Sequence, residues 1–323
     1  MESAFRVATA PFTEHVTKYS LVFDDTQSFS RAHHEFLKND KTIREFNSRL
    51  DETFTLGHNK FSHLSFEQFK KIYGSASVPE DWTSEASPTS SLTPTDNDAI
   101  DWSTDHDGVA VSGIMDQGDC GSCWAFSTVG AIEGMLGIAN NKPADLSEQQ
   151  LVSCDTNNND CAGGWMPSAF TYVADNGLCS EDSYPYLSAD GAVPACAIST
   201  CTPTMVNFTQ NALPDLTEDS LKNAVASQPV AVAVCANEFW QLYKSGVMSH
   251  VNSTCHDHGV LVVGFGNDLE TESDFWKIKN SWGRDYGEEG YIRIQRNVDV
   301  SDQYDVVTGP CGLLTFANFP TLQ

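Results

Sequence analysis

The sequence predicts an α+β fold in which a helical half precedes a β-rich half. The run WAFSTVGAIEGMLGIAN, residues 124–140, has helical periodicity and contains no proline, which indicates a helix. Four later runs are short, rich in β-branched residues and bounded by Gly, Asn or Asp: PVAVAVCA, GVLVVGFG, DFWKIKN and GYIRIQRN. Two halves of this kind, packed together, leave a cleft between their layers.

The front of the chain is expected to be mainly helical. Between about residues 27 and 72 it is rich in charge and carries apolar residues at helical spacing, as in Phe36, Ile43, Phe46 and Leu50.

A linker is expected to follow, because residues 75–98 are dense in Ser, Thr, Pro and acidic residues and have few large apolar ones. Exposed linkers are where proteolysis concentrates. The sequence therefore divides into a front segment at 1–75, a processing linker at 76–98 and a main unit at 99–323. Within the main unit we expect a helical lobe at about 110–210 and a β lobe at about 211–323.

The charge of the chain excludes some classes of partner. It has 323 residues, with 44 Asp and Glu against 18 Lys and Arg. Residues 98–323 alone hold 30 acidic and 8 basic residues, a net charge of −22. A basic patch for nucleic acid or for an anionic membrane is not expected on such a chain, and no run approaches transmembrane length.

The cysteines indicate an oxidising compartment. All ten lie between Cys120 and Cys311. Asn207 and Asn252 stand in N-x-T sequons and are candidate glycosylation sites. We expect a secreted or lysosomal/vacuolar protein. The polar start MESAFRVATA does not resemble a signal peptide, so the signal is expected to be missing from this sequence.

The stretch CGSC, residues 120–123, admits three interpretations. A zinc site needs a second ligand pair, and His256 and His258 stand two apart, unlike the usual finger spacings. A redox dithiol is expected near a βαβ unit, which the surrounding pattern does not indicate. The third is a nucleophilic Cys123 at a helix N-terminus, which needs a cationic partner, an orienting group and oxyanion donors.

Candidates for these roles are present. His258 enters the apolar run HGVLVVGFG, where a strand would hold its ring still. Asn280 ends another strand and can accept a hydrogen bond from the imidazole. Gln117, six residues before Cys123, can donate from its amide beside the Cys123 backbone N–H.

These residues carry a resemblance to the zymogens of papain-like cysteine proteases, of the cathepsin L and plant papain type. Eight motifs occur in the family's order: IDW, CGSCWAFS, LSEQQLVSCD, CAGGW, SYPY, DHGVLVVGFG, KNSWG and CGLLTF. The resemblance implies a two-lobed papain-like fold, with a helical left lobe and a β-barrel-like right lobe, behind an inhibitory propeptide. It also implies a cysteine endopeptidase that forms a thioester acyl-enzyme.

The resemblance assigns a role to each candidate residue. Cys123 is the nucleophile, His258 the general base and acid, and Asn280 the group that orients the imidazole. Gln117 and the Cys123 N–H form the oxyanion hole. Trp282 shields the bond between Asn280 and His258 from water.

The disulfides are also expected from the resemblance. The family pattern pairs Cys120 with Cys161, Cys154 with Cys196, and Cys255 with Cys311. Cys179 and Cys201 remain as a fourth bridge, and Cys196 and Cys201 could exchange roles. Cys235, in a buried-strand pattern, is then the expected unpaired thiol.

The front segment resembles the family's propeptide in part. Four of its residues match the second half of the ERFNIN helix: Phe36, Asn39, Ile43 and Asn47. Ser28 and Ala32 stand where the family has Glu and Arg.

The next propeptide motif also departs at one position. Gly57, Asn59 and Phe61 match G-x-N-x-F-x-D, but the final acid is His63. His63 is either a pH sensor or an exposed, solvated histidine. The family's propeptide blocks the cleft by running opposite to the substrate direction.

The resemblance finally implies a substrate cleft. Gly163 and Gly164 would bond the substrate backbone, and Asp257 and Trp282 would also touch substrate. The S2 pocket would be lined by Met166, Ala233, His256, Gly259 and Phe316. A ring at Phe316 shortens the pocket and favours Val or Leu at P2, while His256 faces either the pocket or solvent. No insertion resembling an occluding loop follows Cys161, which favours an endopeptidase.

We expect a monomeric enzyme. Its expected partners are peptide and protein substrates, the chain's own propeptide and cystatin-like inhibitors. No cofactor or metal is expected. A non-enzymatic alternative is a stable proform that inhibits other proteases through residues 1–75, and a degraded nucleophilic site would favour it.

Overall fold

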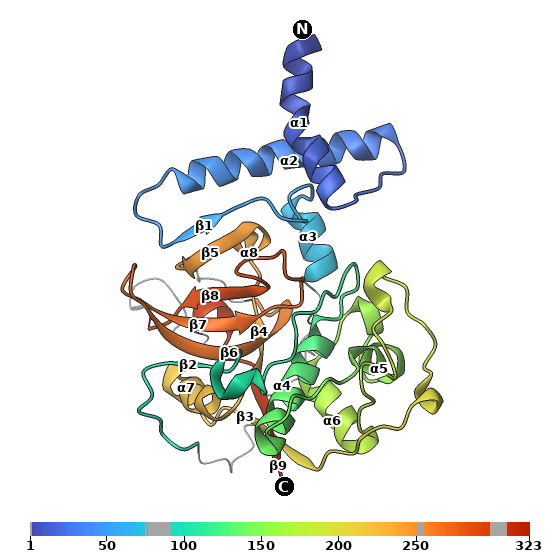
Figure 1. The fold of residues 1–323 in the computed structure, drawn as a ribbon, viewed down its shortest axis with the longest axis vertical. Helices are drawn as coiled ribbons and strands as arrows, with labels where there is room; N and C mark the ends of the chain where they lie inside the picture. The colour runs from blue at the N-terminus through green and yellow to red at the C-terminus, as the bar shows by residue number, and fades with distance from the viewer. Residues whose placement is uncertain (1, 75, 77–91, 251–254, 298–308) are drawn as a thin grey trace.

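The computed structural model describes residues 2–74, 76, 92–250, 255–297 and 309–323, and the side chains from residue 10 onward. It confirms the α+β class. The helices between residues 123 and 176 gather on one side of the main body, and the strands lie on the other together with two later helices (Figure 1). The front segment lies across one end (Figure 1). Most of the linker and the sequon at Asn252 lie outside the described residues.

The front segment contains three helices and one short strand. These are α1 (Glu2–Lys18), α2 (Thr26–Asn47), β1 (Phe54–Leu56) and α3 (Phe66–Tyr73).

Helix α2 begins where Asp25 and Ser28 cap each other. Phe36, Ile43 and Phe46 are buried, as the spacing predicts. Leu50 is fully exposed, so its assignment to this apolar face was wrong. The helix has already ended, because the Asn47 side chain bonds the backbone N–H and C=O of Leu56 and turns the chain back toward β1.

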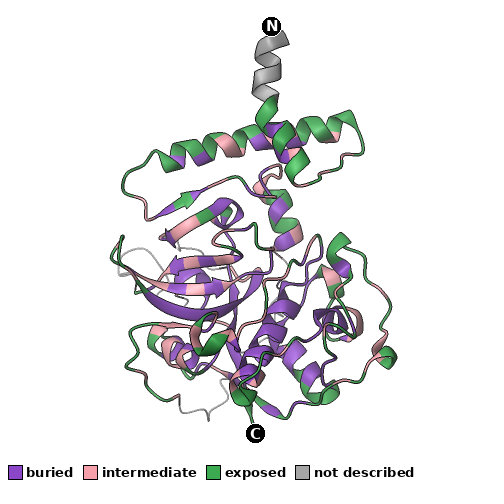
Figure 2. Cartoon of the chain, viewed as in Figure 1, coloured by how far each residue is buried: buried purple, intermediate pink, exposed green. Residues whose placement is uncertain are grey.

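The main body combines helices with a sheet. The helices are α4 (Cys123–Asn140), α5 (Glu148–Cys154), α6 (Met166–Asn176), α7 (Glu218–Ser227) and α8 (Glu238–Leu242). Short 3-10 turns are η1 (Asp105–Gly108), η2 (Asp160–Ala162), η3 (Ser188–Asp190), η4 (Ile198–Thr200) and η5 (Pro310–Gly312). Helix α4 is buried along most of its length, as its apolar sequence requires (Figure 2).

The strands form one sheet that includes a strand from the front segment. They are β2 (Ile100–Asp101), β3 (Phe208–Ala212), β4 (Val230–Val234), β5 (Tyr243–Met248), β6 (His258–Asp268), β7 (Ser273–Lys279), β8 (Tyr291–Gln295) and β9 (Ala317–Leu322). Their order is β1-β5-β8-β7-β6-β4-β9-β3, and β2 pairs with β6. The paired strands of the described chain are antiparallel, except that β5 and β8 are parallel. The lobe boundary expected near residue 210 falls inside β3.

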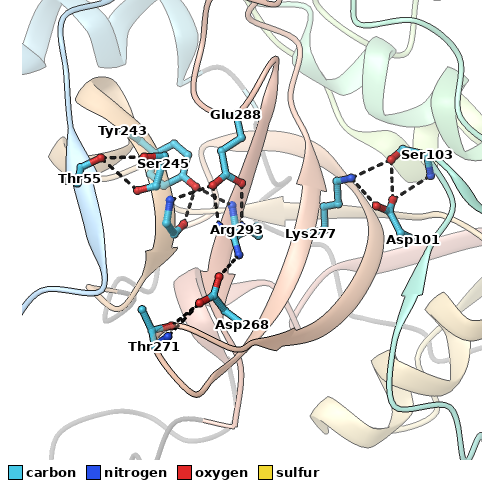
Figure 3. Close-up of polar contacts among 11 residues, drawn as sticks. Thr55, Asp101, Ser103, Tyr243, Ser245, Asp268, Thr271, Lys277, Glu288 and Arg293 are labelled. Atoms are coloured by element: carbon cyan, nitrogen blue, oxygen red, sulfur yellow. Dashed lines mark hydrogen bonds and ion pairs between the residues drawn. The ribbon is translucent and has the colours of Figure 1, made fainter.

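Side chains reinforce these pairings (Figure 3). Thr55 on β1 and Ser245 on β5 share a hydrogen bond of 2.9 Å. Arg293 on β8 binds Glu288 and Asp268, and its hydrogen bonds lower the pKa of Asp268 to about 2. A second link joins β2 to β7, because Lys277 Nζ lies 2.6 Å from Asp101 Oδ2.

Three disulfides match the expected pairs and the fourth differs. The structure joins Cys120–Cys161, Cys154–Cys196 and Cys179–Cys201. It joins Cys255 to Cys235 rather than to Cys311. The reason lies in the sheet register: Val234 on β4 faces His258 on β6, so the chain just beyond β4 meets the chain just before β6.

Cys311 therefore carries the thiol that was expected at Cys235. It is fully buried, and burial raises the pKa of its thiol to about 12. The strand pattern was read as extending to Cys235, but β4 ends one residue earlier at Val234.

Alkylation in denaturant should label Cys123 and Cys311 and leave the other eight cysteines unmodified. Cys311 should react far more slowly in the folded chain, because its burial disfavours the thiolate. Non-reducing peptide mapping should recover Cys235 linked to Cys255. Recovery of Cys255 linked to Cys311, with Cys235 alkylated, would refute this pairing.

Candidate active site

Cys123 is the first residue of α4 and is completely buried. The helix N-terminus carries a partial positive charge that favours a thiolate at this position. The backbone N–H of Gly259, on β6, donates to the Cys123 sulfur over 3.3 Å. The sulfur is therefore held where α4 meets the sheet.

His258 is the first residue of β6 and is buried against Cys123 and Asn280. Its Nε2 lies 2.8 Å from Asn280 Oδ1, directly after the end of β7. Burial of the ring alone would lower the pKa of His258. The hydrogen bond and charge of Cys123, together with the oxygens of Asn280 and Asp257, outweigh that effect and raise this pKa above its usual value. The arrangement favours a protonated imidazole beside the sulfur.

Trp282 covers this pair. Its ring stacks on His258, with centroids 4.6 Å apart and planes at 21°, and it is fully buried. A hydrogen bond that water cannot reach is stronger than an exposed one, so the geometry fits the shielding role expected of Trp282.

Gln117 is fully buried and makes two side-chain hydrogen bonds. Its amide Nε2 donates to Cys120 O over 2.9 Å, and its Oε1 accepts from Ser281 Oγ over 2.7 Å. A primary amide has a second N–H, so one donor remains for a ligand. Ser281 fixes which way this amide points. The sequence analysis did not single out Ser281, although it stands inside the quoted KNSWG motif.

Different physical constraints require glycine at the two positions of the expected cleft. Gly163 adopts a φ of 121°, which other residues rarely adopt. A Cβ on Gly164 would lie 2.5 Å from the Trp124 ring, so only glycine fits there. The first residue of the linker already occupies this place: Ala76 pairs in parallel with Gly164, and its N–H donates to Asp257 O over 2.9 Å.

The expected pocket residues come together around α6, β4 and β6. A Cβ on Gly259 would lie 3.3 Å from Met166 Sδ, and Ala233 N donates to Phe316 O over 3.2 Å. The His256 ring meets Phe316 edge-on, with centroids 4.7 Å apart, and bonds Gly312 O. His256 therefore lies against Phe316 instead of pointing into solvent, and burial lowers the pKa of its ring.

Two family models match this chain. "Papain family cysteine protease" covers residues 97–319, and "Cathepsin propeptide inhibitor domain (I29)" covers residues 12–69. The chain belongs to the papain family of cysteine proteases. It carries that family's propeptide inhibitor domain in front of the peptidase unit.

Relatives span plants and animals. Zingipain-2 from Zingiber officinale is 43% identical over 225 residues, which cover 69% of this chain and 96% of the relative. Digestive cysteine proteinase 3 from Homarus americanus is 35% identical over 99% of this chain and 97% of its own length. The solved digestive procathepsin L2 proteinase from Tenebrio molitor larval midgut has a TM-score of 0.83 at 31% identity, covering 98% of this chain and 100% of its own.

Three aromatic side chains of the front segment pack against Trp282 of the peptidase unit. Phe61, Phe69 and Tyr73 each lie edge-on to Trp282, with centroids 5.4, 5.1 and 5.9 Å away. Asn59 adds a hydrogen bond of 2.8 Å from its Nδ2 to Gln241 O. In a papain-family proform these rings cover the Trp282 face of the active site.

His63 is not the exposed, solvated histidine that was one of its two interpretations. It is partly buried, and its ring lies 5.8 Å from His15 of α1. Its Nδ1 and His15 Nε2 are buried without a hydrogen-bond partner among the described residues. Burial lowers the pKa of both rings, that of His15 to about 3.

The remaining expected sites are placed as follows. Asn207 is exposed just before β3. Among the described residues, one His, Cys, Asp or Glu group has metal-like spacing, namely Cys235, Cys255 and Asp257, and its two cysteines are joined in a disulfide. No helix within the described ranges is long and apolar enough to cross a bilayer.

Proposed function

We propose that this papain-family protease is a cysteine endopeptidase held inactive by its own inhibitor domain. The proposal rests on the arrangement of Cys123, His258 and Asn280. A buried thiol at a helix N-terminus lies beside an imidazole that is hydrogen-bonded to an amide oxygen. This is the arrangement that an activated thiolate nucleophile needs.

The proposed reaction has two halves. The Cys123 thiolate attacks the peptide carbonyl carbon, and the second amide N–H of Gln117 and the Cys123 backbone N–H stabilise the resulting oxyanion. The imidazolium of His258 then gives its proton to the leaving amine as the C–N bond breaks, which leaves a thioester. In the second half neutral His258 takes a proton from water, hydroxide adds to the thioester, and the thiolate leaves.

A medium aliphatic residue at P2 is part of the proposal. Phe316 and Met166 supply apolar walls, and Ala233 and Gly259 add little bulk. Such a pocket fits Val or Leu, and the ring of Phe316 limits its depth. Endopeptidase action is supported by the short Cys161 to Gly163 connection, which offers no chain to close the cleft.

Latency is proposed to depend on the inhibitor domain and to end in acid. His15 lies inside the α1–α2 packing, where it faces His58, His63, Lys18, Phe12 and Phe36. Because the folded pKa of His15 lies below its unfolded value of 6.5, the folded domain loses stability as the pH falls from about 6.5 toward 3.

The setting of the enzyme is also proposed. Disulfides and the exposed sequon at Asn207 support a secreted or lysosomal/vacuolar glycoprotein. Cystatin-like inhibitors as partners and a monomeric state belong to the same proposal.

Hydrolysis of a fluorogenic peptide with Leu or Val at P2 and Arg at P1 tests the function. The chain should be silent at neutral pH and become active after incubation at about pH 4.5 with a thiol reductant, as the front segment is lost. Cys123→Ala should stay silent throughout. A silent wild type from which the front segment has been removed would refute peptidase activity and favour an inhibitor role for the proform.

Asn280→Ala should lower kcat/KM by about 10- to 100-fold, because the buried imidazole loses its acceptor. The Asn280 oxygen favours the protonated ring, so its loss lowers the pKa of His258, and the basic limb of the pH profile should move to lower pH. Asn267→Ala, an exposed asparagine on β6, is the matched control. An unshifted basic limb in Asn280→Ala would contradict the orienting role.

His15→Phe should lower the pH midpoint of acid activation by about half a unit or more, because the new ring fills the same aromatic site and cannot take up a proton. His63→Asn should shift the midpoint in the same direction. His34→Asn, at an exposed position of α2, should leave it in place. Equal midpoints for the wild type, His15→Phe and His63→Asn would exclude these histidines as the sensor.

A further inference from the structure

Asp116 is an exposed residue directly before Gln117, the proposed oxyanion-hole residue. It pairs with Trp282 across an antiparallel bridge, and Gly283 N donates to Met115 O over 3.0 Å. Trp282 in turn stacks on His258, the residue proposed to protonate the leaving amine. Because His258 protonates the leaving amine in the proposed reaction, the residues that follow the scissile bond are expected to lie along Trp282 and beside Asp116.

The carboxylate of Asp116 is held in place by the peptidase unit itself. Its Oδ1 accepts from Gly118 N over 3.0 Å. A Cβ on Gly283 would lie 2.7 Å from Asp116 Oδ2, so the glycine, with a φ of 76°, leaves space for this oxygen. These contacts do not involve the inhibitor domain, so they persist when that domain leaves.

The inhibitor domain shows what this carboxylate binds. Lys60 Nζ lies 2.6 Å from Oδ1 and 2.5 Å from Oδ2 of Asp116. The Lys60 side chain is 21% exposed. The next residue, Phe61, lies edge-on to Trp282. The front segment thus sets a lysine on the leaving-group side. Ala76, the first residue of the linker, lies on the acyl side beside Gly164.

The surrounding charge favours the same kind of occupant. Residues 98–323 carry a net charge of −22 with only eight basic residues. Among them Arg284 follows Gly283, and its charge acts on Tyr291. Among the described residues, Lys60 is the cation that forms an ion pair with Asp116.

We propose that Asp116 is a specificity-determining residue, which selects substrates with Lys or Arg at the first or second position after the scissile bond. In the zymogen Lys60 fills this place, and a basic substrate residue fills it in the released enzyme. The inference rests on the proposed peptidase function and adds the substrate class on the leaving-group side.

Internally quenched peptides test the proposal on the acid-activated enzyme. They share an acyl half with Leu at P2 and differ only in Lys or Gln at the first or second position after the scissile bond. The wild type should cleave one Lys peptide with a kcat/KM about two- to fivefold above its Gln partner, the range of an exposed ion pair. The ratio should fall toward one in about 0.5 M NaCl, which screens such a pair.

Variants assign the preference to one carboxylate. Asp116→Asn should cleave the Lys and Gln peptides with equal kcat/KM, and Asp116→Lys should prefer a Glu peptide. Asp175→Asn removes the same charge from an exposed position of α6 and should keep the wild-type ratio.

The outcomes distinguish failure of the proposed specificity from failure of the proposed peptidase function. An active wild type with equal kcat/KM for Lys and Gln at both positions would overturn the inference alone. A preference that survives in Asp116→Asn would assign it to the overall acidity and also overturn it. A wild type that cleaves none of the peptides would overturn the proposed function, and the inference with it.

Discussion

The packing of α4 on β6 is the constraint on which the rest of the molecule depends. Helix α4 is apolar on nearly every side, so its burial requires a place in the middle of the body. Ser127 Oγ donates to Val260 O over 2.7 Å, and Gly130 leaves room for the Leu261 side chain. Cys123 begins α4 and His258 begins β6, so this packing brings thiol and imidazole together. The reactive pair is therefore a product of the core, and its geometry is fixed before any substrate arrives.

The class of fold and most residues of the candidate site could be predicted from the sequence, because the motifs reflect local geometry. The helical period after Cys123 and the β-rich runs around His258 and Asn280 gave the class of fold and the elements that hold each residue. Ser281 escaped notice because its role is a single hydrogen bond to Gln117, 164 residues away in sequence. The role of Asp116 was not predicted, because a single exposed aspartate forms no recognisable sequence pattern.

Other expectations failed where a boundary or a tertiary contact decides the outcome. Leu50 fits the helical period of α2, but Asn47 ends that helix. Cys235 follows an apolar run, yet β4 stops before it and the register of β4 with β6 sets it beside Cys255. His63 stands at the final position of the G-x-N-x-F-x-D motif, and only the packing of α1 shows that its neighbour is His15. Periodicity carries no information about such long-range partners.

Strand β1 of the inhibitor domain forms one edge of the sheet, and this has a consequence for solubility. β1 pairs with β5, so loss of the domain turns β5 into an outer strand whose backbone groups lack a partner. Such an edge invites a second chain to add itself, and repeated addition leads to aggregates. Lys244 sets a charge on this edge, and Gly246, with a φ of 96°, distorts it beside the bulge opposite Thr55 and Leu56. Both features oppose chain addition, so the strand is already built to stand exposed.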